Sequence, residues 1–143
     1  MPVDRRQQEG LGLHFGHSHC ILCGQDNPGS WQLSFHPGEG TSVHGSFIPS
    51  THLQGYDGLL HGGVICSFLD AAMTHCLFHR DVRAVTADLH VRFVEAISAG
   101  RPVRVRAWIV SVQPPLYRLK AEILQEDRVM AWGEAKFLAR RGP

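Results

Sequence analysis

The longest apolar run of the chain lies near its middle and is interrupted by a single acidic residue. Residues 64–78 are rich in Ala, Leu, Met and Phe, contain no Pro, and are apolar nearly all the way round a helix. This pattern predicts a helix enclosed by protein rather than one lying on a surface. It does not predict a membrane span, because about 18 uninterrupted apolar residues would be needed and Asp70 interrupts the run.

Alternating apolar and polar residues on both sides of this helix predict strands. Two short runs precede it, at residues 31–36 and 42–47, and four longer runs follow, at residues 84–94, 103–112, 117–125 and 129–138. The last two connections are short enough to join antiparallel neighbours. One helix among six strands excludes a doubly wound fold and predicts an α+β fold, a curved antiparallel sheet wrapped around the helix. In the first long run, one face is expected to carry Val85, Ala87, Leu89, Val91 and Phe93.

The few polar side chains of the predicted helix share one stripe. Ser67, Asp70 and Thr74 are spaced i, i+3 and i+7. Burying a carboxylate is costly unless donors compensate, so a helix built only for packing would carry Leu or Ala at position 70. The plain alternative is a carboxylate satisfied by nearby donors. We favour a functional carboxylate, because perturbed carboxyl groups cluster at functional sites.

Two glycines at the predicted start of the helix point to the same site. Gly62 and Gly63 have no side chains and would let a ligand approach the free N–H groups of the first turn. The helix dipole favours negative charge at that end. The sequence therefore predicts a site in which backbone donors and Asp70 act together.

A second cluster of reactive residues lies near the N-terminus. His17, His19, Cys20 and Cys23 offer four metal ligands within a few residues. Most structural zinc sites draw a second ligand pair from further along the chain, so we expect no metal here and keep zinc at Cys20 and Cys23 as the alternative. A redox centre is less favoured, because residues 27–29 (Asn-Pro-Gly) predict a turn instead of a helix start.

Length and charge restrict the class of protein further. The 143 residues suit one domain, expected at 19–143 after a mobile tail at 1–18. The formal net charge of +1 predicts neither a nucleic-acid nor a membrane partner. With no apparent signal peptide and no spaced cysteine framework, we expect a cytoplasmic protein with reduced thiols. The charges on the polar strand faces are expected to form a solvated surface, with phosphate binding as the alternative; they are Arg92, Arg104, Arg106, Arg118, Lys120, Glu122 and Lys136.

These motifs together resemble a known family. His61-Gly62-Gly63, followed by Asp70 nine residues after the His, is similar to the signature of hotdog-fold acyl-CoA thioesterases of the hydroxybenzoyl-CoA and phenylacetyl-CoA type. One branch of that family also opens with Cys-x-x-Cys-Gly and a following Asn-Pro, which residues 20–28 match. The resemblance covers roughly residues 19–138 and implies the hotdog fold.

The resemblance also implies a reaction and roles for the catalytic residues. The Gly62 N–H, with Gly63 as a second candidate donor, would polarise the thioester carbonyl, and Asp70 would act as nucleophile or general base. His61 would orient the loop or the substrate, and the hydroxyl groups of Thr74 and Thr86 would place water or substrate. No cofactor is required by this chemistry.

Further substrate contacts and the assembly follow from the same resemblance. Some relatives contact the substrate through an Asn six residues before the motif's His; here Gly55 stands at that position and Gln54 is the candidate replacement, while Ser67 lies on the same stripe as Asp70. The implied assembly is a homodimer with sites at the subunit interface, with a homotetramer as an alternative. The rival function is a non-hydrolytic acyl-CoA-binding or regulatory hotdog protein.

Overall fold

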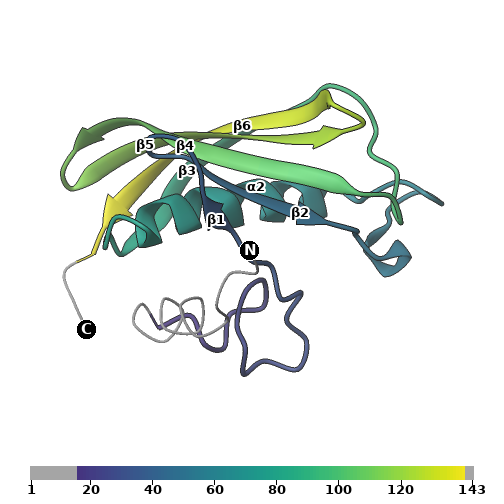
Figure 1. Cartoon of the computed structure of the whole chain (residues 1–143), viewed down its shortest axis with the longest axis horizontal. Coiled ribbons are helices and arrows are strands. Elements are labelled where there is room, and N and C mark those ends of the chain that lie inside the picture. Colours follow the sequence, from purple (N-terminus) through teal and green to yellow (C-terminus); the bar gives the residue numbers. More distant parts are fainter. Residues whose placement is uncertain (1–15, 141–143) are drawn as a thin grey trace.

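The computed structural model describes residues 16–140, so most of the predicted tail at 1–18 lies outside the described residues. Within this range one long helix, α2 (Gly62–Phe78), lies along one face of a curved sheet (Figure 1). The 3-10 helix η1 (Thr51–Leu53) precedes it. The strands are β1 (His36–Pro37), β2 (Val43–Phe47), β3 (Ala84–Phe93), β4 (Val103–Gln113), β5 (Leu116–Gln125) and β6 (Arg128–Ala139).

The six strands form one antiparallel sheet in the order β1-β2-β4-β5-β6-β3. The two predicted hairpins are present, since β4 pairs with β5 and β5 with β6. Strand β3 follows the helix directly and returns to pair with β6, which leaves its other side at the edge of the sheet. The predicted architecture, one central helix wrapped by an antiparallel sheet, is confirmed.

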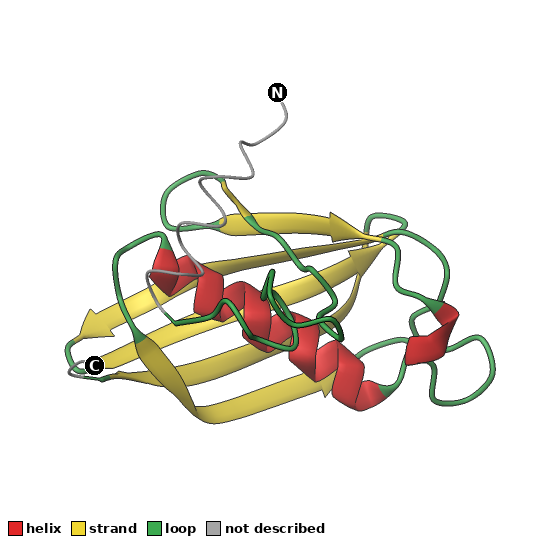
Figure 2. Cartoon of the chain, turned by 90° about the horizontal axis from the view of Figure 1, so that it is seen from below, coloured by secondary structure: helices red, strands yellow, loops and turns green. Residues whose placement is uncertain are grey.

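Helix α2 is buried on almost every side, as its apolar sequence predicts. Its inner face packs on the sheet through side chains such as Leu69, Met73 and Leu77, each at most 1% exposed. Its outer side is covered by the loop segment that precedes β1, which crosses in front of the helix in Figure 2. Trp31 of that segment contacts Phe68 with ring centroids 5.8 Å apart, and His17 meets Phe78 edge-on at 4.8 Å. In the described part of the chain, α2 and the other helical turns are too short or too polar to cross a membrane.

The strand predicted at residues 31–36 is mostly irregular, and only its end belongs to β1. Gln32 has a φ of +56°, a left-handed conformation that breaks an extended strand. The Trp31 and Leu33 N–H groups instead donate to the carbonyls of Ile21 and Leu22, both at 2.9 Å. Leu33 and Phe35 are nevertheless buried. The alternation therefore predicted correctly which side chains point inward, but it was wrong in predicting a strand.

The prediction that the alternating apolar residues of β3 share one face is also wrong, because the strand contains a bulge. Its register against β6 shifts between Thr86 and Asp88, which leaves Ala87 as an extra residue. Thr86 stands opposite the buried Phe137, and Leu89 opposite the buried Ala135, so both face the helix. Val85 therefore lies on the opposite face from Leu89, Val91 and Phe93. The bulge turns the Thr86 hydroxyl toward α2.

His75 is an unusual polar residue of the helix. Its ring lies 5.0 Å from Phe35 and 5.1 Å from Phe78, between centroids, and its Nε2 atom is buried without a hydrogen-bond partner in the described part of the chain. Burial, and then the nearby His79 and His17, lower the pKa of His75 to about 3. The folded state therefore holds this ring neutral where an unfolded chain would protonate it, below about pH 6.5.

We predict that His75 makes the protein acid-labile. Because its pKa is depressed on folding, its contribution is constant above about pH 6.5 and stability falls as the pH decreases toward its folded pKa, by up to about 1.4 kcal/mol per pH unit. Chemical denaturation of wild type and His75→Gln at pH 7, 6, 5 and 4 should show a shallower loss for the variant. His90→Gln, at an exposed histidine of the outer sheet face, is the control and should follow wild type. Parallel stability curves for wild type and His75→Gln would contradict the prediction.

Candidate active site

The start of helix α2 presents one free backbone donor to a small cavity. His61 is the N-cap, and its Nδ1 accepts a 2.9 Å hydrogen bond from the Gly63 N–H. The carbonyl of His61 accepts from the N–H groups of Val64 and Ile65. Within residues 16–140 the Gly62 N–H has no partner. Of the two predicted donors, therefore, Gly62 is available to a ligand while Gly63 is held by His61.

A cavity of about 440 Å³ lies beside this donor. Gly62 and His61 form one wall, and the loop before the helix and the segment after β3 form the rest, through Gly55, Tyr56, Leu59, Leu60 and Ala96. Tyr56 is 86% exposed, and Phe93 closes the other side of Gly62, where a Cβ atom would lie 3.6 Å from its ring. This mostly apolar wall with one backbone donor suits a carbonyl group attached to an apolar chain.

Gln54, which was predicted to contact the substrate, has a structural role in this loop. Its Oε1 accepts a 3.0 Å hydrogen bond from the Gly58 N–H, and it forms a bridge with Leu60. Gly55 packs closely on the motif, since a Cβ there would lie 3.4 Å from the His61 Cα. A larger side chain at position 55 would therefore press on His61. Gln54 shapes the cavity by holding the loop.

Asp70 lies further along the same helix, next to the edge strand β3. Its Oδ1 accepts a 2.5 Å hydrogen bond from the Thr86 hydroxyl, which the β3 bulge turns inward. Burial raises the pKa of Asp70, while the Thr86 hydrogen bond and the nearby His17 act in the opposite direction. A desolvated carboxylate of raised pKa is a stronger base than one in water.

The two hydroxyl groups of the predicted stripe do not reach the carboxylate. Ser67 Oγ donates to the Gly63 carbonyl and Thr74 Oγ1 to the Asp70 carbonyl, both at 2.9 Å and both within the helix. Such bonds to the carbonyl four residues earlier are common for Ser and Thr in helices. Of the predicted hydroxyls, Thr86 is the one that the structure brings to the Asp70 side chain.

Asp70 and Gly62 are not brought together within one chain. They are eight residues apart on one helix, about 12 Å at a rise of 1.5 Å per residue, and Asp70 is not among the residues that line the cavity beside Gly62. The chain therefore carries two halves of the predicted site, a donor half at Gly62 and a carboxylate half at Asp70.

Two neighbours of these halves were not predicted. His17 belongs to a segment more than forty positions from the helix, yet it lies near enough to oppose the rise in the pKa of Asp70, and Phe93 lies against Gly62. No local sequence signal points to His17, because its position depends on how the N-terminal segment crosses α2. Phe93 was assigned to the inner face of its strand, which indicated burial rather than a site.

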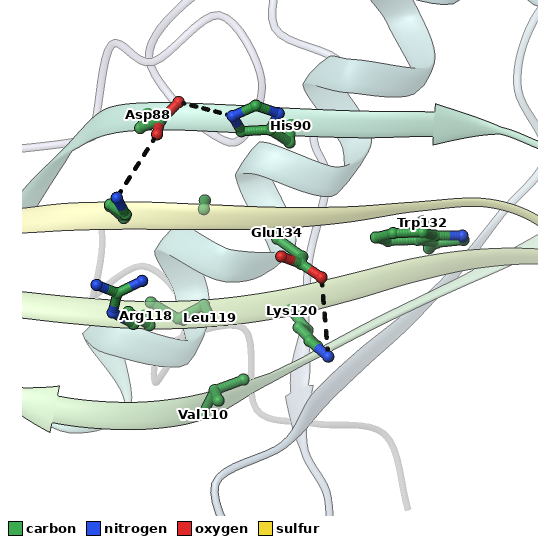
Figure 3. Close-up of a pocket in the computed structure, with 10 residues that line it drawn as sticks. Asp88, His90, Val110, Arg118, Leu119, Lys120, Trp132 and Glu134 are labelled. Atoms are coloured by element: carbon green, nitrogen blue, oxygen red, sulfur yellow. Dashed lines mark ion pairs between the residues drawn. The ribbon is translucent and has the colours of Figure 1, made fainter.

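A wider hollow of about 560 Å³ lies on the outer face of the sheet (Figure 3). Most of its charged side chains pair with one another: Lys120 lies 3.8 Å from Glu134, and Asp88 lies 4.0 Å from Lys136 and 3.5 Å from His90. These pairs are exposed, as expected for a solvated sheet face. Gly62 and Asp70 do not line this hollow, so its size alone does not make it the candidate active site.

The enclosed helix and the wrapped antiparallel sheet define the hotdog fold. The family model of the thioesterase superfamily matches residues 57–131, more than half of the chain, and the chain belongs to this superfamily. The match spans the helix, its two glycines and Asp70. No curated protein matches the chain significantly.

Solved structures share the fold at low sequence identity. The thioesterase superfamily protein RHA08564 has a TM-score of 0.79 and 22% identity over 85% of this chain, which spans 63% of that protein's length. Zebrafish thioesterase superfamily member 2 has a TM-score of 0.71 and 15% identity, covering 90% of this chain and 96% of its own. The Streptococcus mutans protein smu.793, solved with acetyl-CoA, has a TM-score of 0.70 and 15% identity, covering 76% of this chain and 88% of its own.

We predict that Thr86→Val raises the pKa of the Asp70 carboxyl group, because the lost hydrogen bond favours the charged form. The pKa can be measured by NMR titration of the side-chain carboxyl carbon, assigned with Asp70→Asn. Thr74→Val is the matched control: it removes the same hydroxyl one helical turn away, where the partner is the Asp70 backbone carbonyl. An unchanged or lowered pKa in Thr86→Val, or an equal rise in both variants, would count against the assignment.

Proposed function

We propose that the protein hydrolyses an acyl-CoA thioester to the free acid and CoA thiol. The observation that carries the proposal is that one chain of the thioesterase superfamily has both a free helix-start N–H, at Gly62, and a largely buried carboxylate, at Asp70. The complex of smu.793 with acetyl-CoA supports a CoA thioester as the ligand class.

The Gly62 N–H acts on the thioester carbonyl. As the carbon is attacked, charge develops on its oxygen, and a preorganised N–H at the positive end of a helix stabilises that charge. Loss of one such donor costs about 3–4 kcal/mol in other hydrolases. His61 supports this donor indirectly, because its bond to Gly63 fixes the first turn of the helix.

Asp70 supplies the second half of the reaction. Its carboxylate either attacks the carbonyl carbon, forming an anhydride that water then hydrolyses, or removes a proton from an attacking water. In both routes the C–S bond breaks and the thiolate leaves with the CoA portion. The Thr86 hydroxyl donates to Oδ1 and so fixes the orientation of the carboxylate, which leaves the other oxygen to act on the carbonyl carbon or the water. The chemistry needs no cofactor.

A second copy of the chain completes the site. β3 is an edge strand, and its apolar residues Val85 and Phe93 are 45% and 52% exposed; Val94, just after the strand, is 53% exposed. Such an edge is suited to pairing with another chain. Thr86, near one end of β3, contacts Asp70. Phe93, at the other end of the strand, lies next to Gly62.

Antiparallel pairing of β3 with its own copy brings the two halves together. If the two-fold axis passes near the middle of β3, the Thr86 end of one strand lies beside the Phe93 end of its copy. Each homodimer then has two sites, each with Gly62 from one subunit and Asp70 from the other. Pairing of such dimers into tetramers is compatible with this arrangement.

We predict that Asp70→Asn lowers turnover by about 100-fold or more while the fold is kept, because the amide is nearly isosteric but cannot act as base or anionic nucleophile. Thiol release from the best acyl-CoA substrate measures the effect, and circular dichroism checks the fold. If the variant is as fast as wild type, Asp70 is not catalytic. If wild type binds acyl-CoA without releasing thiol, the non-hydrolytic function is correct instead.

We predict that two inactive variants restore activity when they are combined. Gly62→Pro deletes the donor N–H at the first helical position, where Pro is tolerated, and His61 already has the extended backbone that precedes Pro (φ −64°, ψ 138°). After joint unfolding and refolding with Asp70→Ala, each mixed dimer holds one intact and one doubly damaged site. A statistical mixture should therefore regain about a quarter of wild-type activity.

Gly62→Ala is the control for this experiment. It keeps the N–H and adds a methyl group at ordinary contact distance from Phe93, so it should lose less activity than Gly62→Pro. If mixed dimers form, as shown by differently tagged subunits, yet activity stays at the level of the parents, the shared-site arrangement is wrong and both residues act within one chain.

A further inference from the structure

The first described residues fold into a tight turn that gathers three metal-ligating atoms. The ligand atoms of His17, Cys20 and Cys23 lie within 4.8 Å of one another, and all three side chains are partly buried. The fourth predicted ligand, His19, turns away: its Nδ1 lies 3.1 Å from Ser18 Oγ. The structure thus brings together three of the four ligands that the sequence offered.

The spacing of these atoms suits a tetrahedral zinc-class ion. Typical Zn–N and Zn–S bond lengths place a nitrogen and a sulfur ligand roughly 3.6 Å apart in a tetrahedron. His17 Nδ1 and Cys23 Sγ are 3.7 Å apart. Two thiols and one imidazole form a soft donor set that favours zinc over magnesium or calcium. Both thiols are free in the structure.

The backbone of the turn is shaped around Cys20. The Leu22 N–H donates to Cys20 Sγ at 3.3 Å, and the Gly24 N–H donates to the Cys20 carbonyl at 2.9 Å. Gly24 is buried, and a Cβ there would lie 2.4 Å from the Cys20 nitrogen, so no other residue fits. N–H groups that point at a ligand sulfur stabilise a thiolate and hold it in place.

Residues 17–33 are held by hydrogen bonds between loops and by apolar contacts with helix α2. Among residues 17–33 there is no helix or strand, and hydrogen bonds such as Asp26 N–H to the Ser18 carbonyl (2.8 Å) join its loops. Yet this segment covers the outer side of α2 through Trp31 and Leu33, and His17 packs on Phe78. All three ligands lie within residues 17–23, so a bound ion would fix this turn and, with it, the place where His17 packs on Phe78.

We propose that His17, Cys20 and Cys23 bind one zinc-class divalent cation that fastens residues 17–33 onto the outer side of helix α2. Three protein ligands leave the fourth tetrahedral position to water or another small ligand. The cation is structural: its bonds form when the turn closes, so binding stabilises the folded segment. The site stands independently of the proposed thioesterase activity.

Cobalt and zinc titrations of the reduced, chelator-treated full-length protein test this site. Co²⁺ should bind once per chain with a thiolate charge-transfer absorption, and Zn²⁺ should displace it. His17→Gln and Cys23→Ser should each weaken binding about 10-fold or more. His19→Gln and Cys66→Ser are the matched controls, because neither side chain belongs to the cluster, and both should bind like wild type. Circular dichroism confirms that each variant is folded.

Hydrogen exchange supplies the second measurement. Zinc should slow amide exchange in residues 17–33 of wild type but leave β4 and β5 unchanged, and Cys23→Ser should lose the effect. The proposal is overturned if the reduced protein binds no Co²⁺, if the two thiols simply form a disulfide, or if the cluster variants and the controls bind equally. Binding without any change in exchange at 17–33 would overturn the fastening role.

Discussion

Helix α2 must be enclosed by protein, and this requirement governs how the sheet, the N-terminal loop and the candidate site are placed. Its side chains are apolar nearly all round, and each large one that is buried contributes about 1.5–3 kcal/mol. The sheet covers one side of the helix, and residues 17–35 cover much of the other. The remaining side of the helix lies next to β3, and Asp70 is partly buried there. Its pKa is raised because enclosure of the helix removes most of its water.

The edge strand β3 positions the groups of the candidate site. The bulge at Ala87 turns Thr86 inward to hold the carboxylate, and the far end of the same strand places Phe93 against Gly62. A regular strand would have directed Thr86 to solvent. The same edge is the surface through which a second copy would join the two halves, so one strand determines both the position of Asp70 and the route to a complete site.

Much of this could be predicted from the sequence, because it depends on local periodicity. The helix, the last four strands and their hairpins follow from apolar patterns, and the His-Gly-Gly motif identified the helix start. The bulge could not be predicted, since Val85 and Ala87 continue the apolar alternation through it. The irregular backbone at Gln32 was hidden in the same way. The influence of His17 on the pKa of Asp70 depends on the tertiary fold, which no spacing along the chain reveals.

Thiol release from a panel of aryl-, short-chain and long-chain acyl-CoA thioesters is the decisive test of catalysis by Asp70 and Gly62. The reaction is followed with a thiol reagent from pH 5 to pH 9. We expect at least one thioester to be hydrolysed, and the rate to fall at acid pH as the Asp70 carboxylate is protonated. If the protein binds CoA thioesters but hydrolyses none of them at any pH, Asp70 and Gly62 are not catalytic groups.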